Sequence, residues 1–277
     1  MNPSFPPEES APFPEGARPM ERVLLQKGSP ARSTGEAPVA RERRITLSIQ
    51  DVGDFAVMAL PGDLAALAAG FAFTEGMISS REEIALVQAC PEDPDVVRLL
   101  LEDPSSAERS SRNLVITSSC GICGGEKAVE EIFREIPPVG DSLRVDREWI
   151  WKAEDRLFSR QELYPSTRGT HAAGIFSAGG EMIAFAEDVG RHNALDKVIG
   201  TCLLEGRKTA GLALLLSSRV SFELVVKCAR AGLELLAAAS APSTLAVEAA
   251  GKWGITLCAP VREDRAFLFT HPRRVQG

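Results

Sequence analysis

The feature that most constrains the fold of this chain is a unit that recurs after residue 113: a short apolar run, a polar or glycine-rich loop and, in most cases, a helical pattern. Alternating strands and helices predict an α/β fold. In an open α/β sheet such loops gather at the carboxyl ends of the strands, where ligands bind. We therefore expect one shared ligand site built from five loops, at residues 118–124, 187–193, 217–219, 240–244 and 262–265.

The chain is expected to have three parts. Residues 1–40 are rich in Pro, Gly, Ser and Glu and lack apolar periodicity, which predicts a disordered N-terminal extension. Residues 41–112 are expected to form a smaller N-terminal accessory α+β region. Residues 113–277 carry the recurring unit and form the α/β domain.

The accessory region begins with strand-like runs at 45–49 and 55–60. Asp63 is then expected to act as the N-cap of a helix over residues 64–75. Two further runs, at 84–87 and 96–101, flank a proline-rich turn and predict a hairpin.

The α/β domain shows similar local signals. Asp146 is expected to cap a helix with apolar positions from Trp149 to Phe158, and Ser221 to cap another. The runs 172–176 and 182–186, separated by two glycines, predict a hairpin.

Composition narrows the classes of function. No run approaches the roughly 20 apolar residues that span a bilayer, and the start of the chain does not resemble a signal peptide, so we expect a cytoplasmic protein with no membrane contact. A net charge of −7 argues against binding to nucleic acid. Any anionic ligand must therefore be met by local positive charge.

Two cysteines carry the predicted chemistry. Cys120 and Cys123 lie in a glycine-rich turn at the expected start of a helix, where N–H groups and the helix dipole favour a thiolate. Cys120 is the expected nucleophile, and Cys123 an auxiliary or resolving thiol. A sulfur carried as a persulfide on Cys120 follows the chemistry of thiol–disulfide exchange. Three other cysteines fall in apolar runs and are interpreted as buried small hydrophobes: Cys202, Cys228 and Cys258.

Two alternatives use the same cysteines. A zinc-stabilised binding module needs four ligands, and the sequence has neither a second CxxC nor a histidine pair at zinc spacing. A deaminase-like enzyme pairs CxxC with an upstream HxE, but here His171 lies downstream and Ala173 stands where the catalytic Glu would be.

Several longer motifs make the chain resemble the formate dehydrogenase accessory sulfurtransferases, also called the formate dehydrogenase accessory protein D family. The resemblance runs from about Arg44 to the C-terminus. It rests on SSCGICG at 118–124, GTHAAG at 169–174, AEDVGRHNALDK at 186–197, LSSRVSFE at 216–223 and SAPSTLAVE at 240–248.

The resemblance implies a cytidine deaminase-like sandwich with a smaller accessory region. It also implies that a cysteine desulfurase supplies sulfur as a persulfide on Cys120, and that this sulfur passes to the molybdenum cofactor, bis-molybdopterin guanine dinucleotide, for formate dehydrogenase. We expect a homodimer, with GDP as a mimic of the bound cofactor. The segment implied to contact the cofactor is Pro260, Val261, Arg262, Glu263, Asp264 and Arg265. Pro260 and Glu263 depart from the aromatic residue and the glycine that family members commonly carry there.

Four more residues are candidates for nucleotide contacts. Arg219 is the preferred phosphate ligand, because a guanidinium can bind phosphate oxygens with two hydrogen bonds. His192 is either a residue of a helix start or a guanine or phosphate contact, and His171 is open in the same way. Asp188 either accepts from guanine N–H groups or forms a turn.

Overall fold

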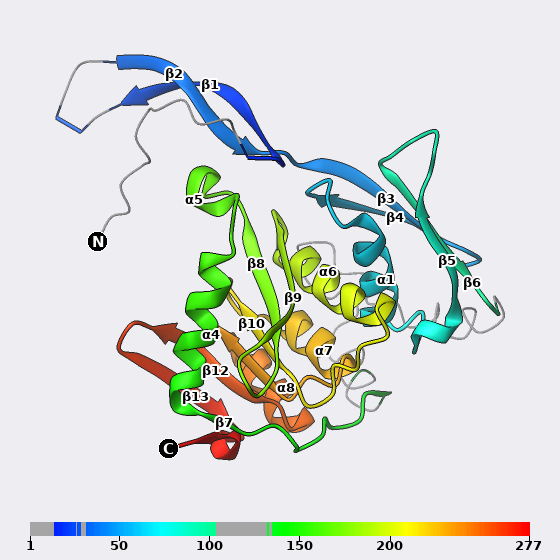
Figure 1. Ribbon diagram of the computed structural model, residues 1–277, viewed down its shortest axis with the longest axis vertical. Helices are drawn as coiled ribbons and strands as arrows, with labels where there is room; N and C mark the ends of the chain where they lie inside the picture. The colour runs from blue at the N-terminus through cyan, green and yellow to red at the C-terminus, as the bar shows by residue number, and fades with distance from the viewer. Residues whose placement is uncertain (1–13, 26, 29–31, 104–131, 133–134) are drawn as a thin grey trace.

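The computed structural model describes residues 14–25, 27–28, 32–103, 132 and 135–277 (Figure 1). The predicted strand at 114–117 and the loop that holds Cys120 and Cys123 lie outside the described residues.

A six-stranded mixed sheet forms the centre of the α/β domain, in the order β13-β12-β11-β10-β8-β9. Strands β10, β11 and β12 are parallel, while β8, β9 and β13 run antiparallel to their neighbours. All residues of β10 and β11 are buried, as expected for strands covered on both faces. The predicted mixed α/β fold is confirmed, and the kinship to cytidine deaminases stays a prediction. The strand bounds are β8 His171–Phe176, β9 Met182–Asp188, β10 Ala213–Leu216, β11 Leu235–Ala238, β12 Thr256–Arg262 and β13 Arg265–Thr270.

Helices cover both faces of this sheet (Figure 1). Helices α6 (Arg191–Leu204), α7 (Phe222–Arg230) and α8 (Thr244–Trp253) enclose one core, and α4 (Arg147–Ser159) packs over the other face. The short helix α5 (Tyr164–Thr167) follows α4. No helix among the described residues is long and apolar enough to cross a membrane.

The helix caps agree with the sequence in one case and differ in two. The Asp146 side chain accepts from Trp149 N at 3.0 Å, as predicted. Asp63 has left-handed backbone (φ 54°) and makes no cap bond, because a capping side chain needs extended backbone at that position. Ser221 also makes no cap bond, and the negative charge of Glu223 in the first turn complements the start of α7 instead.

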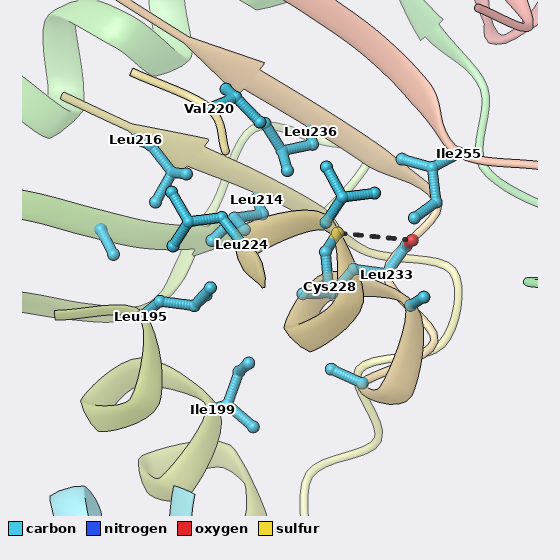
Figure 2. Packing of buried hydrophobic residues seen from close by; sticks show 14 of the residues in the cluster. Leu195, Ile199, Leu214, Leu216, Val220, Leu224, Cys228, Leu233, Leu236 and Ile255 are labelled. Atoms are coloured by element: carbon cyan, nitrogen blue, oxygen red, sulfur yellow. Dashed lines mark hydrogen bonds between the residues drawn. The ribbon is translucent and has the colours of Figure 1, made fainter. Parts of the chain in front are cut away.

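The three cysteines predicted to be buried small hydrophobes are confirmed. Figure 2 shows Cys228 among leucines and isoleucines of the main core, with its Sγ 3.8 Å from Leu233 O. Burial raises the pKa of Cys202 to about 11 and that of Cys258 to about 12, and also raises the pKa of Cys228. These thiols therefore stay protonated at neutral pH.

The accessory region has its own sheet, order β4-β3-β6-β5, and its own apolar core beneath α1. The predicted strands, helix and hairpin of this region are confirmed. Their bounds are β3 Arg43–Ile49, β4 Gly53–Ala59, α1 Leu64–Thr74, the 3-10 turn Arg81–Glu83, β5 Ile84–Ala89 and β6 Val96–Leu101.

Helix α1 crosses α6 at two glycines. A Cβ atom on Gly70 would lie 1.8 Å from Asp196 O, and one on Gly200 would lie 1.9 Å from Ala66 O. Only glycine allows the two backbones to approach this closely. The crossing fixes the accessory region against α6, which begins just after the carboxyl end of β9.

The N-terminal part differs from the sequence-based expectation. Strands β1 (Ala17–Leu25) and β2 (Arg32–Ala40) form an antiparallel hairpin that projects from the body (Figure 1), so a disordered extension over all of residues 1–40 is wrong for this stretch. Backbone pairing along the full length of both strands stabilises the hairpin, although its side chains are mostly exposed. Composition reports burial and not backbone pairing, which is why it missed this element.

The C-terminus is anchored at the sheet edge opposite the loops. Strand β14 (Val275–Gln276) follows the 3-10 turn Pro272–Arg274 and pairs with β7 (Val145–Asp146). The buried Arg274 guanidinium lies 3.3 Å from Glu234, whose carboxylate also accepts from Ser142 N and Leu143 N.

Candidate functional site

The predicted site residues that the structure describes lie where β9, β10, β11 and β12 end, and we call this end of the six-stranded sheet the ligand edge. His171 begins β8 and faces Asp188, the last residue of β9. On the next strand, Ser217 Oγ accepts from Ala172 N at 2.8 Å, and Ser217 N donates to Ala172 O at 3.0 Å. Arg219 follows two residues later. The carboxyl end of β10 therefore lies beside the start of β8.

The same edge continues through β11 and β12. Ala239 N donates to Leu216 O at 3.0 Å, and the Arg262 guanidinium donates to Ala239 O. Arg262 is thus separated from Arg219 by the width of β11. The positional expectation that loops gather at one edge agrees with this topology for the four loops that the structure describes.

Three buried polar atoms at this edge have no hydrogen-bond partner among the described residues: Arg191 Nε, His192 Nε2 and Ser221 Oγ. Arg191 and His192 open helix α6, and Ser221 precedes α7. A buried polar atom without a partner costs about 1–3 kcal/mol, so such atoms mark a place where a ligand can supply the missing bonds. Free N–H groups at the two helix starts favour an anion there.

Positive charge surrounds these atoms although the chain is acidic. Burial, together with the positive charges of Lys227 and Arg191, lowers the pKa of His192 to about 4. Burial also lowers the pKa of His171, together with Arg191 and Arg219 and against Asp188. Both imidazoles are therefore neutral at neutral pH, and each offers one donor and one acceptor. Arg191 and Arg219 supply the charge for an anionic ligand, because the Lys227 ammonium is already paired with Asp196 and Glu75.

Asp188 holds the loop between β9 and α6 through internal hydrogen bonds. Its carboxylate is fully buried and lies 2.7 Å from Lys197 Nζ. It also accepts from Leu60 N at 3.1 Å, Gly190 N at 2.9 Å and Asn193 Nδ2 at 3.0 Å. Because both oxygens are engaged by internal donors, the structure places Asp188 as a residue that shapes the loop, in line with the turn-forming alternative.

The segment Pro260–Arg265 ends β12 and makes the turn into β13. Val261 is buried, and the Arg262 carbonyl accepts from Trp151 Nε1 at 2.7 Å. Glu263 and Asp264 form an exposed turn, and Arg265 lies 3.8 Å from Asp264. Arg262 is the member of this segment that reaches back towards the ligand edge.

Arg191 and Ser221 were not singled out as site residues from the sequence. Arg191 lies in the predicted ligand loop 187–193 beside His192, so the sequence did carry a signal for it. The unpartnered Ser221 hydroxyl has no sequence signal, because a serine before a helix is normally a cap.

The fold and this edge define an α/β protein with a cationic candidate site at the carboxyl ends of its strands. The family comparison is more specific: residues 40–276 match the model of the FdhD/NarQ family, and the chain belongs to that family. The resemblance inferred from the sequence motifs is thereby confirmed.

Relatives and a solved structure support the assignment. The sulfur carrier protein FdhD of Bordetella bronchiseptica is 35% identical over 259 residues, covering 92% of this chain and 93% of the relative. The protein of the same name from Mycolicibacterium paratuberculosis is 40% identical over 231 residues, covering 79% and 84%. The crystal structure of a putative formate dehydrogenase accessory protein from Desulfotalea psychrophila is similar with a TM-score of 0.77 and 26% identity, covering 94% of this chain and 99% of that one.

Proposed function

We propose that this protein is a sulfur carrier that takes persulfide sulfur from a cysteine desulfurase onto Cys120. It passes the sulfur to the molybdenum cofactor, bis-molybdopterin guanine dinucleotide, and so activates a formate dehydrogenase. Family membership and the names of the relatives support the sulfur-carrier role. The proposal includes a homodimer that works in the cytoplasm, where thiols stay reduced.

The observation that carries the cofactor part of the proposal is the set of unpartnered polar atoms at the start of α6 and α7. Arg191 Nε, His192 Nε2 and Ser221 Oγ are buried without partners in the described part of the chain. A guanine dinucleotide carries a diphosphate, and its oxygens would accept from the arginine and hydroxyl groups. Arg219 is exposed beside them and adds a second guanidinium.

Sulfur uptake needs only one nucleophile. The Cys120 thiolate attacks the terminal sulfur of the desulfurase persulfide, a new S–S bond forms at Cys120, and the desulfurase cysteine leaves as a thiolate. The reaction exchanges one S–S bond for another, so no external oxidant is required.

Release of the sulfur at the oxidation level of sulfide needs two electrons, and Cys123 can supply them. Attack of the Cys123 thiolate on Cys120 Sγ forms a Cys120–Cys123 disulfide and expels the terminal sulfur as sulfide, which the cofactor accepts. A thiol reductant then restores both cysteines. This step assigns Cys123 to release and not to uptake.

Intact-mass spectrometry after incubation with a cysteine desulfurase and cysteine tests the proposal. We expect a gain of one sulfur atom in the wild type and in Cys123→Ala, and none in Cys120→Ala. Cys90→Ala is the matched control, because that thiol lies in the accessory region and donates to Glu92. An undiminished adduct in Cys120→Ala would refute the assignment of the carrier thiol.

A further inference from the structure

A pocket lies beside the ligand edge, on the side of α4 and α5. Its volume is about 350 Å³, at the lower end of the range of about 300–1,000 Å³ typical of small-molecule sites. It adjoins the candidate site because His171 and Ser217 belong to both. The side chains that matter for its chemistry are Phe158, Gln161, Tyr164, Arg168, His171 and Ser217.

Gln161 is the unusual residue of this pocket. It is 5% exposed, yet neither Oε1 nor Nε2 has a hydrogen-bond partner among the described residues. Its backbone N donates to Phe158 O at 3.2 Å, so the residue is held at the end of α4. A buried primary amide that leaves a donor and an acceptor unused is costly, and a ligand with the complementary pair of groups would relieve that cost.

The other lining residues restrict which chemical class of ligand the pocket can bind. A primary amide presents an acceptor beside a donor, and therefore pairs with a flat group that carries N–H next to an acceptor. The Arg168 guanidinium, held 5.1 Å from the centre of the Tyr164 ring, offers donors only. It favours a ligand whose acceptor is a carbonyl oxygen over one that presents an amino group. Phe158 and Tyr164 supply aromatic surface for stacking.

We propose that this pocket binds a fused heterocycle with a lactam edge, an N–H beside a C=O, and that Gln161 pairs with both groups. The natural source of that edge rests on the proposed function. Guanine and pterin both carry it, and both occur in the molybdenum cofactor. The binding of such a heterocycle does not itself depend on sulfur transfer.

Calorimetric titration of the full-length protein with GDP, ADP and free pterin tests this inference. GDP and ADP share their phosphates, so their difference in affinity isolates the base. We expect the wild type to bind a lactam probe, GDP or pterin, more tightly than ADP. Gln161→Met keeps the size of the side chain and removes both hydrogen-bonding atoms. It should weaken the binding of that lactam probe by about tenfold or more.

Two further variants complete the design. Arg168→Ala changes an exposed residue and should also weaken the binding of that probe. This second variant keeps the test valid if Gln161→Met fails to fold. Gln88→Met is the matched control, because Gln88 is an exposed glutamine on β5, and it should change nothing. A loss confined to GDP assigns the pocket to guanine, and one confined to pterin assigns it to pterin.

Unchanged affinity for both lactam probes in a folded Gln161→Met protein would overturn the inference, and so would ADP binding as tight as that of the lactam probes. The persulfide on Cys120 separates this failure from that of the proposed function. If Gln161→Met still gains sulfur but binds the probes normally, only the pocket assignment falls. If no sulfur is gained while the Gln161 effect is present, the sulfur-carrier proposal falls and the pocket stands.

Discussion

The Lys227 ammonium donates to both carboxylate oxygens of Asp196, at 2.9 and 2.8 Å, and both side chains are buried. The same ammonium lies 2.9 Å from Glu75, which ends α1 of the accessory region. Burial alone would lower the pKa of Lys227, but the two carboxylates outweigh it and raise that pKa. One buried charge therefore links α7, α6 and the accessory region.

Removal of this ammonium should be strongly destabilising. Lys227→Met leaves two buried carboxylates without a counter-charge, and we expect a loss of about 3–5 kcal/mol in the free energy of unfolding. Urea unfolding followed by circular dichroism measures it. Lys208→Met, on an exposed lysine, is the control and should stay within about 0.5 kcal/mol of the wild type. Equal stability of the two variants would show that the ion pair is not needed.

Stability should fall in mild acid because of His192. Its pKa is lowered to about 4 in the folded protein by burial and nearby cations, whereas an unfolded histidine titrates near about 6.5. Between these values the unfolded chain binds more protons, so stability is lost as the pH drops through this window. We expect His192 to account for a loss of about 2 kcal/mol between pH 7 and pH 5. Chemical unfolding at both pH values should show a shallower dependence in His192→Gln, and an unchanged slope would contradict the assignment.

The crossing of α1 and α6 should not tolerate a methyl group. Gly70→Ala places a Cβ atom 1.8 Å from Asp196 O, so the helices must separate. We expect the free energy of unfolding to fall by about 1–3 kcal/mol. Gly251→Ala in α8 is the matched control, because its Cβ would make only ordinary contact, at 3.6 Å from Thr270 Cγ2. That change should be neutral or stabilising. Similar melting temperatures for the two variants would refute the close crossing.

Arg219 should contribute more to GDP affinity than Arg262. Arg219 is exposed next to the starts of α6 and α7, whereas the Arg262 guanidinium already donates to Ala239 O and Val261 O. We expect Arg219→Ala to weaken GDP binding by about tenfold or more, through loss of a charge-assisted hydrogen bond of roughly 1.5–3 kcal/mol. Arg262→Ala should have a smaller effect. The reverse ranking in a calorimetric titration would move the phosphate site towards β12.

Metal analysis separates the sulfur carrier from a zinc-stabilised module. A carrier needs a free thiolate at Cys120, so we expect no stoichiometric zinc and no change of Tm when a chelator is added. Zinc bound one to one, with melting of the fold on chelation, would favour the module.

Short-range patterns predicted the elements well. The apolar runs located β3, β4, β8 and β9, and the spacing around Trp149 located α4. Such elements can be predicted because burial of one face gives the sequence a regular spacing of apolar residues. The motifs at 186–197 and 216–223 also identified the family. The persulfide residue itself, Cys120, is still a prediction, since it lies outside the described residues.

Long-range relationships could not be predicted in this way. The pairing of Asp188 with Lys197, the contact of Gly70 with Asp196 and the unpartnered hydroxyl of Ser221 all depend on how separate elements pack. The β1–β2 hairpin was missed for a related reason, since backbone pairing leaves little trace in composition.

The hydrogen bonds of Asp188 make the ligand edge and the accessory region thermodynamically linked. Leu60 N donates to Asp188, and Asn193, one residue after His192, donates to Met58 O. A ligand that fixes the start of α6 therefore also restrains the connection between β4 and α1. The amide of Leu60 should exchange its hydrogen with solvent more slowly once the site is filled, although it touches no ligand. The protection factor of this amide therefore reports on ligand binding at a distance.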